Sequence, residues 1–454
     1  MKTSQKYRTF NCCLALLATT LLFFGCDILD PEEESDKAFT AKFSEGYIDE
    51  NEIAFIVLSD MDGNVIEYEF WNGNKNQYFQ STQESEIMVT LGVYRPYDNR
   101  VYMTSNIGVK PEEWTWKGIH GIEYQGEVNL EFTGYTGSSG WCTISGPYSH
   151  RINELPPAGS IRLPLYDSPA DLLVVLCPDN HEQRQLWVRG VEQWETREVD
   201  ISELGEPMLR KDVQFPFPMS EFQYTVDAFL EAGDYYSPPF WLPSSHNMYG
   251  EEVMSSMGTC YPKELNDFRT RLVSFSDSKR WEGDYLDSYQ FGQIPQSIKF
   301  IDADAEIMKA AKGQLEVRLS GEIDSYETRW TSDMGTNTVY WTVYCDPETP
   351  SFSLPQMPEE IRTSFGLPTR DSYSASRLRL IEYPDLAGFD EVIHTLFKSE
   401  EYFFNIATRG VRARVKQIGS DDGTVGKATR ESNNQYEFSP FPTQGEYRHS
   451  VNEP

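Results

Sequence analysis

The sequence predicts a mainly β fold, with tandem β-sandwich domains of the immunoglobulin-like or transthyretin-like kind, then a larger β-rich C-terminal region with a few short helices. Short segments alternate apolar and polar residues, as at residues 65–71, where Ile66, Tyr68 and Phe70 share one side. This period of two is typical of strands that are buried on one face. Tight-turn residues separate such segments, and aromatic residues make up 14% of the chain, which suits sandwich cores.

A first sandwich domain is predicted at residues 38–117. The continuous apolar run at 53–58 suits a central strand. Residues 65–71 follow it after a turn at 60–64, because Gly63 readily takes the positive φ that a tight hairpin needs. Further strands of this domain are expected at 87–93 and 101–104.

A second sandwich domain is predicted at residues 118–208. Its segments 172–177 and 185–189 resemble the strand pair at the start of the first domain, and Val57 and Val175 are 118 residues apart in this comparison. The similarity suggests a duplicated domain, although residue identity is weak. The predicted strands are 128–132, 161–165, 172–177 and 185–189.

The C-terminal region is predicted to cover residues 209–420, with a polar tail at 421–454. One short helix is expected between Pro358 and Gly366, because proline suits the start of a helix and glycine its end. An apolar stripe at helical spacing predicts a second helix at residues 389–397. The predicted strands are 315–319, 339–344, 377–381, 402–407 and 411–416.

The N-terminus combines basic residues, an apolar run at 14–24 and the pair Gly25-Cys26. The run is shorter than the roughly 20 apolar residues that a membrane-spanning helix needs, so residues 1–25 are predicted to be a cleaved signal peptide. Gly25-Cys26 resembles the lipobox of bacterial lipoproteins, which implies cleavage before Cys26 and acylation of that cysteine. An ordinary secreted protein and an uncleaved anchor are the alternatives.

Residues 26–37 form an acidic segment that is expected to be a lipidated, solvated tether, since like charges repel and little apolar surface is present. An acidic stretch after the acylated cysteine is similar to the export signal of surface lipoproteins of Bacteroidota. The resemblance implies an outer-membrane protein, lipid-anchored and exposed at the cell surface. A periplasm-facing location is the alternative.

The chain carries a formal net charge of −32. Such a surface repels phosphate backbones and anionic lipid headgroups, so nucleic acid is excluded as a partner and membrane contact is expected through the lipid on Cys26. The remaining cysteines allow three complete disulfide connectivities, with Cys177 expected to be a buried thiol; they are Cys142, Cys177, Cys260 and Cys345. Neither they nor the histidines have metal-ligand spacing, so no metal or cofactor is predicted.

Two charged groups are also candidate sites. The alternating Asp302, Asp304 and Glu306 suit a cation site or an acid/base pair, but a solvated strand edge or helix start is the favoured interpretation in a chain this acidic. A basic group, with Val411, Ala413 and Val415 facing inward between its members, predicts ion pairing with acids on a sheet face, or a site for an anionic sugar. Its members are Arg409, Arg412, Arg414 and Lys416.

The aromatic residues are the candidate ligand-binding residues. Rings on loops stack against the apolar faces of sugars or anchor protein partners, whereas sandwich cores also consume aromatics. Trp114 and Trp116 are a second, less favoured candidate platform. The main candidates lie in a Pro/Ser-rich stretch and are Tyr235, Tyr236, Phe240, Trp241 and Tyr249.

The sequence therefore favours a non-enzymatic cell-envelope lipoprotein that binds a glycan, or a protein partner such as an adhesin or a fimbrial component. No catalytic residue is identified. A hydrolase of extracellular polysaccharide, using a carboxylate pair that the sequence does not locate, is the alternative. A structural subunit whose open sheet accepts a partner strand is the third possibility.

Overall fold

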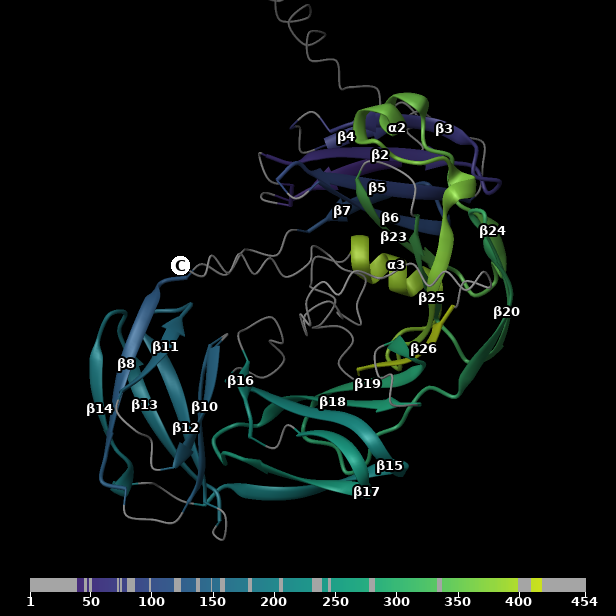
Figure 1. Ribbon diagram of the computed structural model, residues 1–454. Coiled ribbons are helices and arrows are strands. Elements are labelled where there is room, and N and C mark those ends of the chain that lie inside the picture. The colour runs from purple at the N-terminus through teal and green to yellow at the C-terminus, as the bar shows by residue number, and fades with distance from the viewer. Residues whose placement is uncertain are drawn as a thin grey trace, which may run out of the picture.

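The computed structural model confirms the mainly β class (Figure 1). Two α-helices, α2 (Glu359–Phe365) and α3 (Phe389–Phe397), and two 3₁₀ turns, Ile201–Glu203 and Arg370–Ser372, accompany the strands in the part of the chain that it describes. No helix within that part is long and apolar enough to cross a membrane. The described residues are 39–44, 47–48, 51–71, 73, 76–79, 86–97, 99–117, 124–135, 139–147, 149–155, 160–178, 182–203, 207–230, 239–243, 246–276, 282–332, 337–398 and 410–418.

The first seven strands form two facing sheets. One has the order β4-β1-β7, with β1 parallel to β7, and the other includes β3-β2-β5-β6. Phe39, Ile56 and Trp114 are fully buried between them. The strands are β1 (Phe39–Phe43), β2 (Ile53–Ser59), β3 (Val65–Phe70), β4 (Asn76–Phe79), β5 (Ile87–Arg95), β6 (Arg100–Val109) and β7 (Glu113–Trp116).

The next seven strands form a second sandwich. Its sheets have the orders β11-β8-β14, with β8 parallel to β14, and β10-β9-β12-β13. Leu130, Ile144 and Val174 are fully buried in its core. The strands are β8 (Gly126–Thr133), β9 (Gly140–Gly146), β10 (Ser149–Leu155), β11 (Ser160–Leu165), β12 (Ala170–Pro178), β13 (Arg184–Val191) and β14 (Thr196–Asp200).

The two sandwiches have the same topology, strand for strand, from β1–β7 to β8–β14. In this correspondence β2 matches β9, and β5 matches β12. Val57 lies in β2 and Val175 lies in β12, which are not corresponding strands, so the alignment of Val57 with Val175 was wrong. Both residues lie in inner strands that are covered on both faces, and such strands have continuously apolar sequences. The topology supports a duplicated unit, but the strands that correspond are not the ones that the sequence suggested.

The C-terminal strands extend the sheet of the first sandwich. β23 pairs in parallel with β6, giving a 13-stranded sheet that curves from β3 to β15 and β17 (Figure 1). The first sandwich and the C-terminal region therefore share one sheet. The added strands are β15 (Leu209–Phe229), β16 (Phe240–Trp241), β17 (His246–Tyr261), β18 (Asp267–Phe275), β19 (Tyr285–Gly292), β22 (Ser325–Thr331), β23 (Thr338–Cys345), β25 (Ser374–Glu382) and β26 (Val411–Gln417).

Separate layers cover the two faces of this sheet. On the outer side lie α2 and a three-stranded sheet of β20 (Ala303–Ala311), β21 (Gln314–Gly321) and β24 (Ser351–Ser353). α3 packs on the inner side, with its predicted apolar stripe buried. α2 ends at Gly366, which has φ 60° as expected of a C-terminal glycine. Both predicted helices are confirmed.

The predicted strands agree with the structure wherever it describes them, and Gly63 has φ 81° in the predicted hairpin turn. The predicted strand 402–407 lies outside the described residues. The second sandwich packs on the C-terminal region through the outer face of β12, where Leu173 and Val175 meet Tyr224 and Phe240 in one apolar cluster.

Candidate functional site

One end of the second sandwich brings together three aromatic side chains from different connections. Tyr124 precedes β8, Tyr166 follows β11, and Trp194 lies in the turn between β13 and β14. The exposed fractions are 50% for Tyr124 and 68% for Trp194, while Tyr166 is half-buried. These three residues are called the aromatic cluster below.

The rings of the aromatic cluster contact one another edge to face. The ring centroids of Tyr124 and Tyr166 are 6.2 Å apart with planes at 74°, and those of Tyr124 and Trp194 are 6.4 Å apart with planes at 82°. Such pairs contribute about 0.5–1.5 kcal/mol beyond their area burial. Tyr124 therefore packs against both other rings, and the surface that the three rings form is not flat.

The backbone of Trp194 is strained. Its φ is 62°, at the third position of a turn in which the Glu195 N–H donates to the Glu192 carbonyl at 3.3 Å. Glycine or asparagine usually occupies such a position, and the left-handed region costs other residues roughly 1–2 kcal/mol. A bulky residue kept exposed there at a stability cost is a physical indication of a functional role.

Several contacts hold the turn in this conformation. The Trp194 N–H donates to the Glu127 carbonyl at 2.6 Å, and the Gln193 N–H donates to Ser168 Oγ at 3.2 Å. A Cβ atom at Gly126 would lie 3.0 Å from Trp194 Cε2, so the indole ring rests directly against the glycine backbone. The ring is therefore positioned before any ligand arrives.

Acidic groups surround the aromatic cluster. Glu195 pairs with Arg197 at 2.6 Å, and this hydrogen bond holds the pKa of Glu195 below its usual value. Partial burial, followed by the charge of Glu127, raises the pKa of the Tyr124 hydroxyl. Glu192 and Asp167 are exposed beside Gln193 and Tyr166, respectively. The cluster thus lies in a locally negative environment.

The corresponding end of the first sandwich is covered. In its β6–β7 connection, Lys110 Nζ lies 2.6 Å from Asp390 Oδ2, and Glu112 pairs with Lys398. Trp114 stacks on Phe397 of α3 with centroids 4.3 Å apart. Trp114 and Trp116 are 0% and 4% exposed, so they are core residues and not the platform considered from the sequence. The same topology therefore has one covered end and one exposed aromatic end.

The aromatic residues predicted from the sequence lie elsewhere. Phe240 is 1% exposed and contacts Trp187 edge to face at 5.3 Å, so it joins the second sandwich to the C-terminal region and has no free face for a ligand. Trp241 stacks on His150 at 5.2 Å, and its N–H donates to Ser145 Oγ. Three further candidates lie outside the described residues or, in β17, have undescribed side chains: Tyr235, Tyr236 and Tyr249.

The predicted basic group pairs with acids, as one of its two interpretations required. Arg412 lies 2.7 Å from Glu382, while Lys416 lies 2.5 Å and Arg414 3.6 Å from Asp304. The Lys416 hydrogen bond lowers the pKa of Asp304. Val411, Ala413 and Val415 face inward as expected, and Asp304 and Glu306 lie on the exposed face of the edge strand β20, while Arg409 lies outside the described residues.

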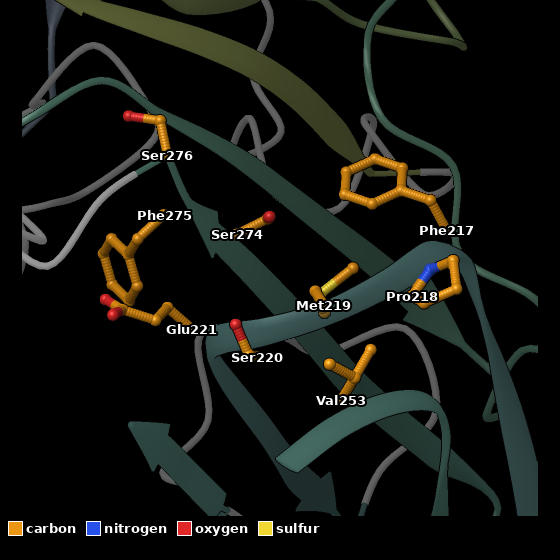
Figure 2. Close-up of a pocket in the computed structure, with 9 residues that line it drawn as sticks. All are labelled: Phe217, Pro218, Met219, Ser220, Glu221, Val253, Ser274, Phe275 and Ser276. Atoms are coloured by element: carbon orange, nitrogen blue, oxygen red, sulfur yellow. The ribbon is translucent and has the colours of Figure 1, made fainter. Parts of the chain in front are cut away.

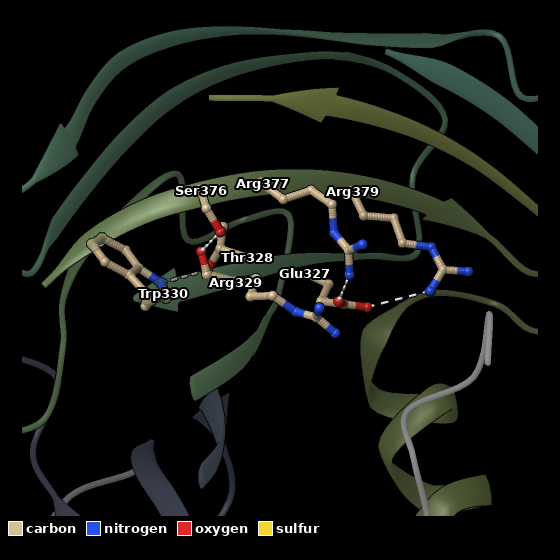
Figure 3. Close-up of polar contacts among 7 residues, drawn as sticks. All are labelled: Glu327, Thr328, Arg329, Trp330, Ser376, Arg377 and Arg379. Carbon is tan, nitrogen blue, oxygen red and sulfur yellow. Dashed lines mark hydrogen bonds and ion pairs between the residues drawn. The ribbon is translucent and has the colours of Figure 1, made fainter. Parts of the chain in front are cut away.

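The inner face of the large sheet carries a buried ion-pair group (Figure 3). Glu327 is 5% exposed and accepts from Arg377 at 3.4 Å and from Arg379 at 3.3 Å. Burial alone would raise the pKa of Glu327, but the charges of Arg379, Arg377 and Arg329 outweigh it and hold the pKa low. A carboxylate kept ionised in this way is suited to structural pairing and not to donating a proton.

A cavity of about 280 Å³ lies beside β15, β17 and β18, and Figure 2 shows the residues that line it. Met219, Val253 and Phe275 supply apolar surface, and Glu221 is the only titratable group among the lining residues. Glu221 Oε2 is buried and has no hydrogen-bond partner among the described residues. A single carboxyl group does not provide the pair that the glycosidase mechanism needs.

The four cysteines of the described chain are free thiols. Cys177 is 4% exposed, which confirms the buried thiol predicted there, and burial raises its pKa to about 12. No group of three metal-ligating side chains converges within the described ranges. Cys26 lies outside them.

No protein-family model matches this chain, and no curated protein matches it. The aromatic cluster therefore rests on its own geometry. Sequence reasoning missed it because its members are separated along the chain and none lies in an aromatic-rich stretch. The available signal was Trp194 itself, a tryptophan within the polar sequence Glu192-Gln193-Trp194-Glu195 between two strands.

Proposed function

We propose that this protein is a lipid-anchored cell-surface protein that binds a glycan through the aromatic cluster without altering it chemically. The exposed, strained Trp194 carries the proposal. Tryptophan and tyrosine rings offer apolar faces for sugar rings and polar edges for their hydroxyl groups. A conformation that costs stability is retained when the presented side chain is used.

The size of the aromatic cluster favours a glycan over a protein partner. A stable protein interface needs about 800 Å² from each side, with an apolar centre surrounded by a polar rim. Three rings at a loop end, two of them next to exposed acids, provide a smaller and more polar contact. Sugar chains match such a surface because they contact proteins through a few rings and hydroxyl groups.

The anchor places this surface outside the cell in our proposal. Cys26 would carry the lipid and residues 26–37 would form the acidic tether. Two or more acyl chains give durable attachment, since each buried methylene contributes about 0.8 kcal/mol. A solvated tether leaves the second sandwich free to contact polymers in the medium.

The test is binding of the soluble ectodomain, residues 27–454, to a panel of soluble polysaccharides. Trp194→Ala and Tyr124→Ala are each expected to weaken binding by roughly tenfold, the upper end of what one aromatic contact contributes. Tyr97→Ala is the matched control, because Tyr97 is 70% exposed on the first sandwich. Binding that persists unchanged in both cluster variants, or no polysaccharide binding by the parent, would overturn the proposal. Either result would favour a protein as the partner.

A further inference from the structure

We infer that the aromatic cluster selects a single glycan chain that carries no acidic groups, such as a neutral or amine-bearing polysaccharide. This inference rests on the proposed glycan-binding function and adds the class of ligand. The charges around the rings and the angles between the rings support it separately.

The charges next to the aromatic cluster are predominantly negative. Glu127 is close enough to act on the Tyr124 hydroxyl, and Glu192 begins the Trp194 turn. Two nearby arginines are already paired with acids, Arg197 with Glu195 and Arg189 with Asp171. A uronate, sulfate or sialic acid unit would meet repulsion here, whereas a hydroxyl or ammonium group would find acceptors.

The ring planes prevent a flat ligand from lying on Tyr124 and on either neighbouring ring at the same time. Tyr166 and Trp194 stand at 74° and 82° to Tyr124, so the three faces are not coplanar. The surface of a crystalline polymer needs coplanar rings in order to contact several of them at once. A single flexible sugar chain can instead stack one sugar ring on Trp194 while another part of the chain contacts the edge of Tyr124.

The experiment compares four soluble probes by isothermal titration with the ectodomain, residues 27–454. The probes are a neutral β-glucan, a neutral α-mannan, chitosan oligosaccharides and polygalacturonate. We expect at least one of the first three to bind at least tenfold more tightly than polygalacturonate at low salt. Sedimentation with crystalline cellulose or chitin is expected to leave the protein in solution.

Two variants test the electrostatic part. Glu127→Gln and Glu192→Gln keep the backbone contacts of the turn, because Trp194 bonds the Glu127 carbonyl and not its side chain. Each is expected to improve polygalacturonate affinity by about twofold at low salt, with less improvement at 0.5 M salt. Glu306→Gln, on the distant β20, is the control and should change nothing.

The outcomes separate the inference from the function it rests on. Polygalacturonate bound as tightly as the neutral chains, in a way that Trp194→Ala abolishes, would overturn the inference and leave glycan binding in place. Binding to crystalline cellulose or chitin through Trp194 would do the same. No binding to any probe, or binding that Trp194→Ala leaves intact, would overturn both.

Discussion

The strain at Trp194 predicts that two substitutions with the same loss of function will differ in stability. Trp194→Ala and Trp194→Gly both remove the indole and its contacts with Gly126 and Tyr124. Alanine keeps the cost of φ 62°, about 1–2 kcal/mol, whereas glycine has no such cost. Glycine loses about 0.5–1 kcal/mol more backbone entropy on folding. The midpoints of these two ranges therefore make the glycine variant more stable by about 0.75 kcal/mol.

Urea denaturation of the ectodomain, followed by tryptophan fluorescence, measures this difference. Both variants lack the same one of the 10 tryptophans, so their fluorescence baselines match. Trp194→Asn is expected to fall between them, because asparagine tolerates the left-handed region better than alanine. Both the alanine and the glycine variants should fail to bind polysaccharide.

An alanine variant as stable as the glycine variant, or more stable, would refute the strain argument. Trp194 would then be an ordinary turn residue whose exposure has no stability cost. The control compares Gln193→Ala with Gln193→Gly in the same urea assay. The alanine variant should be the more stable of these two, which separates the strain at Trp194 from the general effect of glycine in the turn.

Four further predictions follow from other parts of the fold. Glu327→Gln should lower the free energy of unfolding by about 3–5 kcal/mol by leaving two buried arginines without their carboxylate, whereas Glu306→Gln, in an exposed pair, should cost less than about 1 kcal/mol in the same urea assay. The folded pKa of Glu327 is lowered, so its stabilisation is present above the pKa of the unfolded carboxyl and is lost as pH falls through the folded value; acid titration of the parent and of Glu327→Gln should show this difference. Gly92→Ala should destabilise by about 1–3 kcal/mol, measured by thermal unfolding, because its Cβ would lie 2.0 Å from Phe55 Cζ and push that ring off Phe365. Cys26→Ser in the full chain should move the protein from the detergent phase to the aqueous phase in a phase-partition assay, and unchanged partition would contradict lipidation at that residue.

Local patterns were sufficient to predict individual elements. The continuous run at 53–58 predicted β2, the alternation at 65–71 predicted β3, and the turn between them followed from Gly63. The apolar stripe of α3 was equally readable. These features depend on neighbouring residues, since side-chain periodicity and allowed φ values are local properties of the chain.

Pairing and exposure were decided by the tertiary structure. The parallel contact of β23 with β6 joins residues far apart in the sequence. Neither strand's own sequence indicates which strand it pairs with. Phe240 looked like a loop aromatic but packs at an interface with an exposed fraction of 1%. The duplicated topology was visible only after strand order was known, because β2 and β9 share a position and little sequence.

The sequence by itself determined the β class, the positions of many strands and of both helices, and the expectation of an anchor at Cys26. The tertiary structure alone brought Tyr124, Tyr166 and Trp194 together from three connections and left Tyr124 and Trp194 exposed. The reason is physical: hydrophobic periodicity reports which face of a strand is buried, but a loop residue has no periodicity. Its burial depends on which other parts of the chain pack against it. α3 packs against this end of the first sandwich and does not pack against the corresponding end of the second.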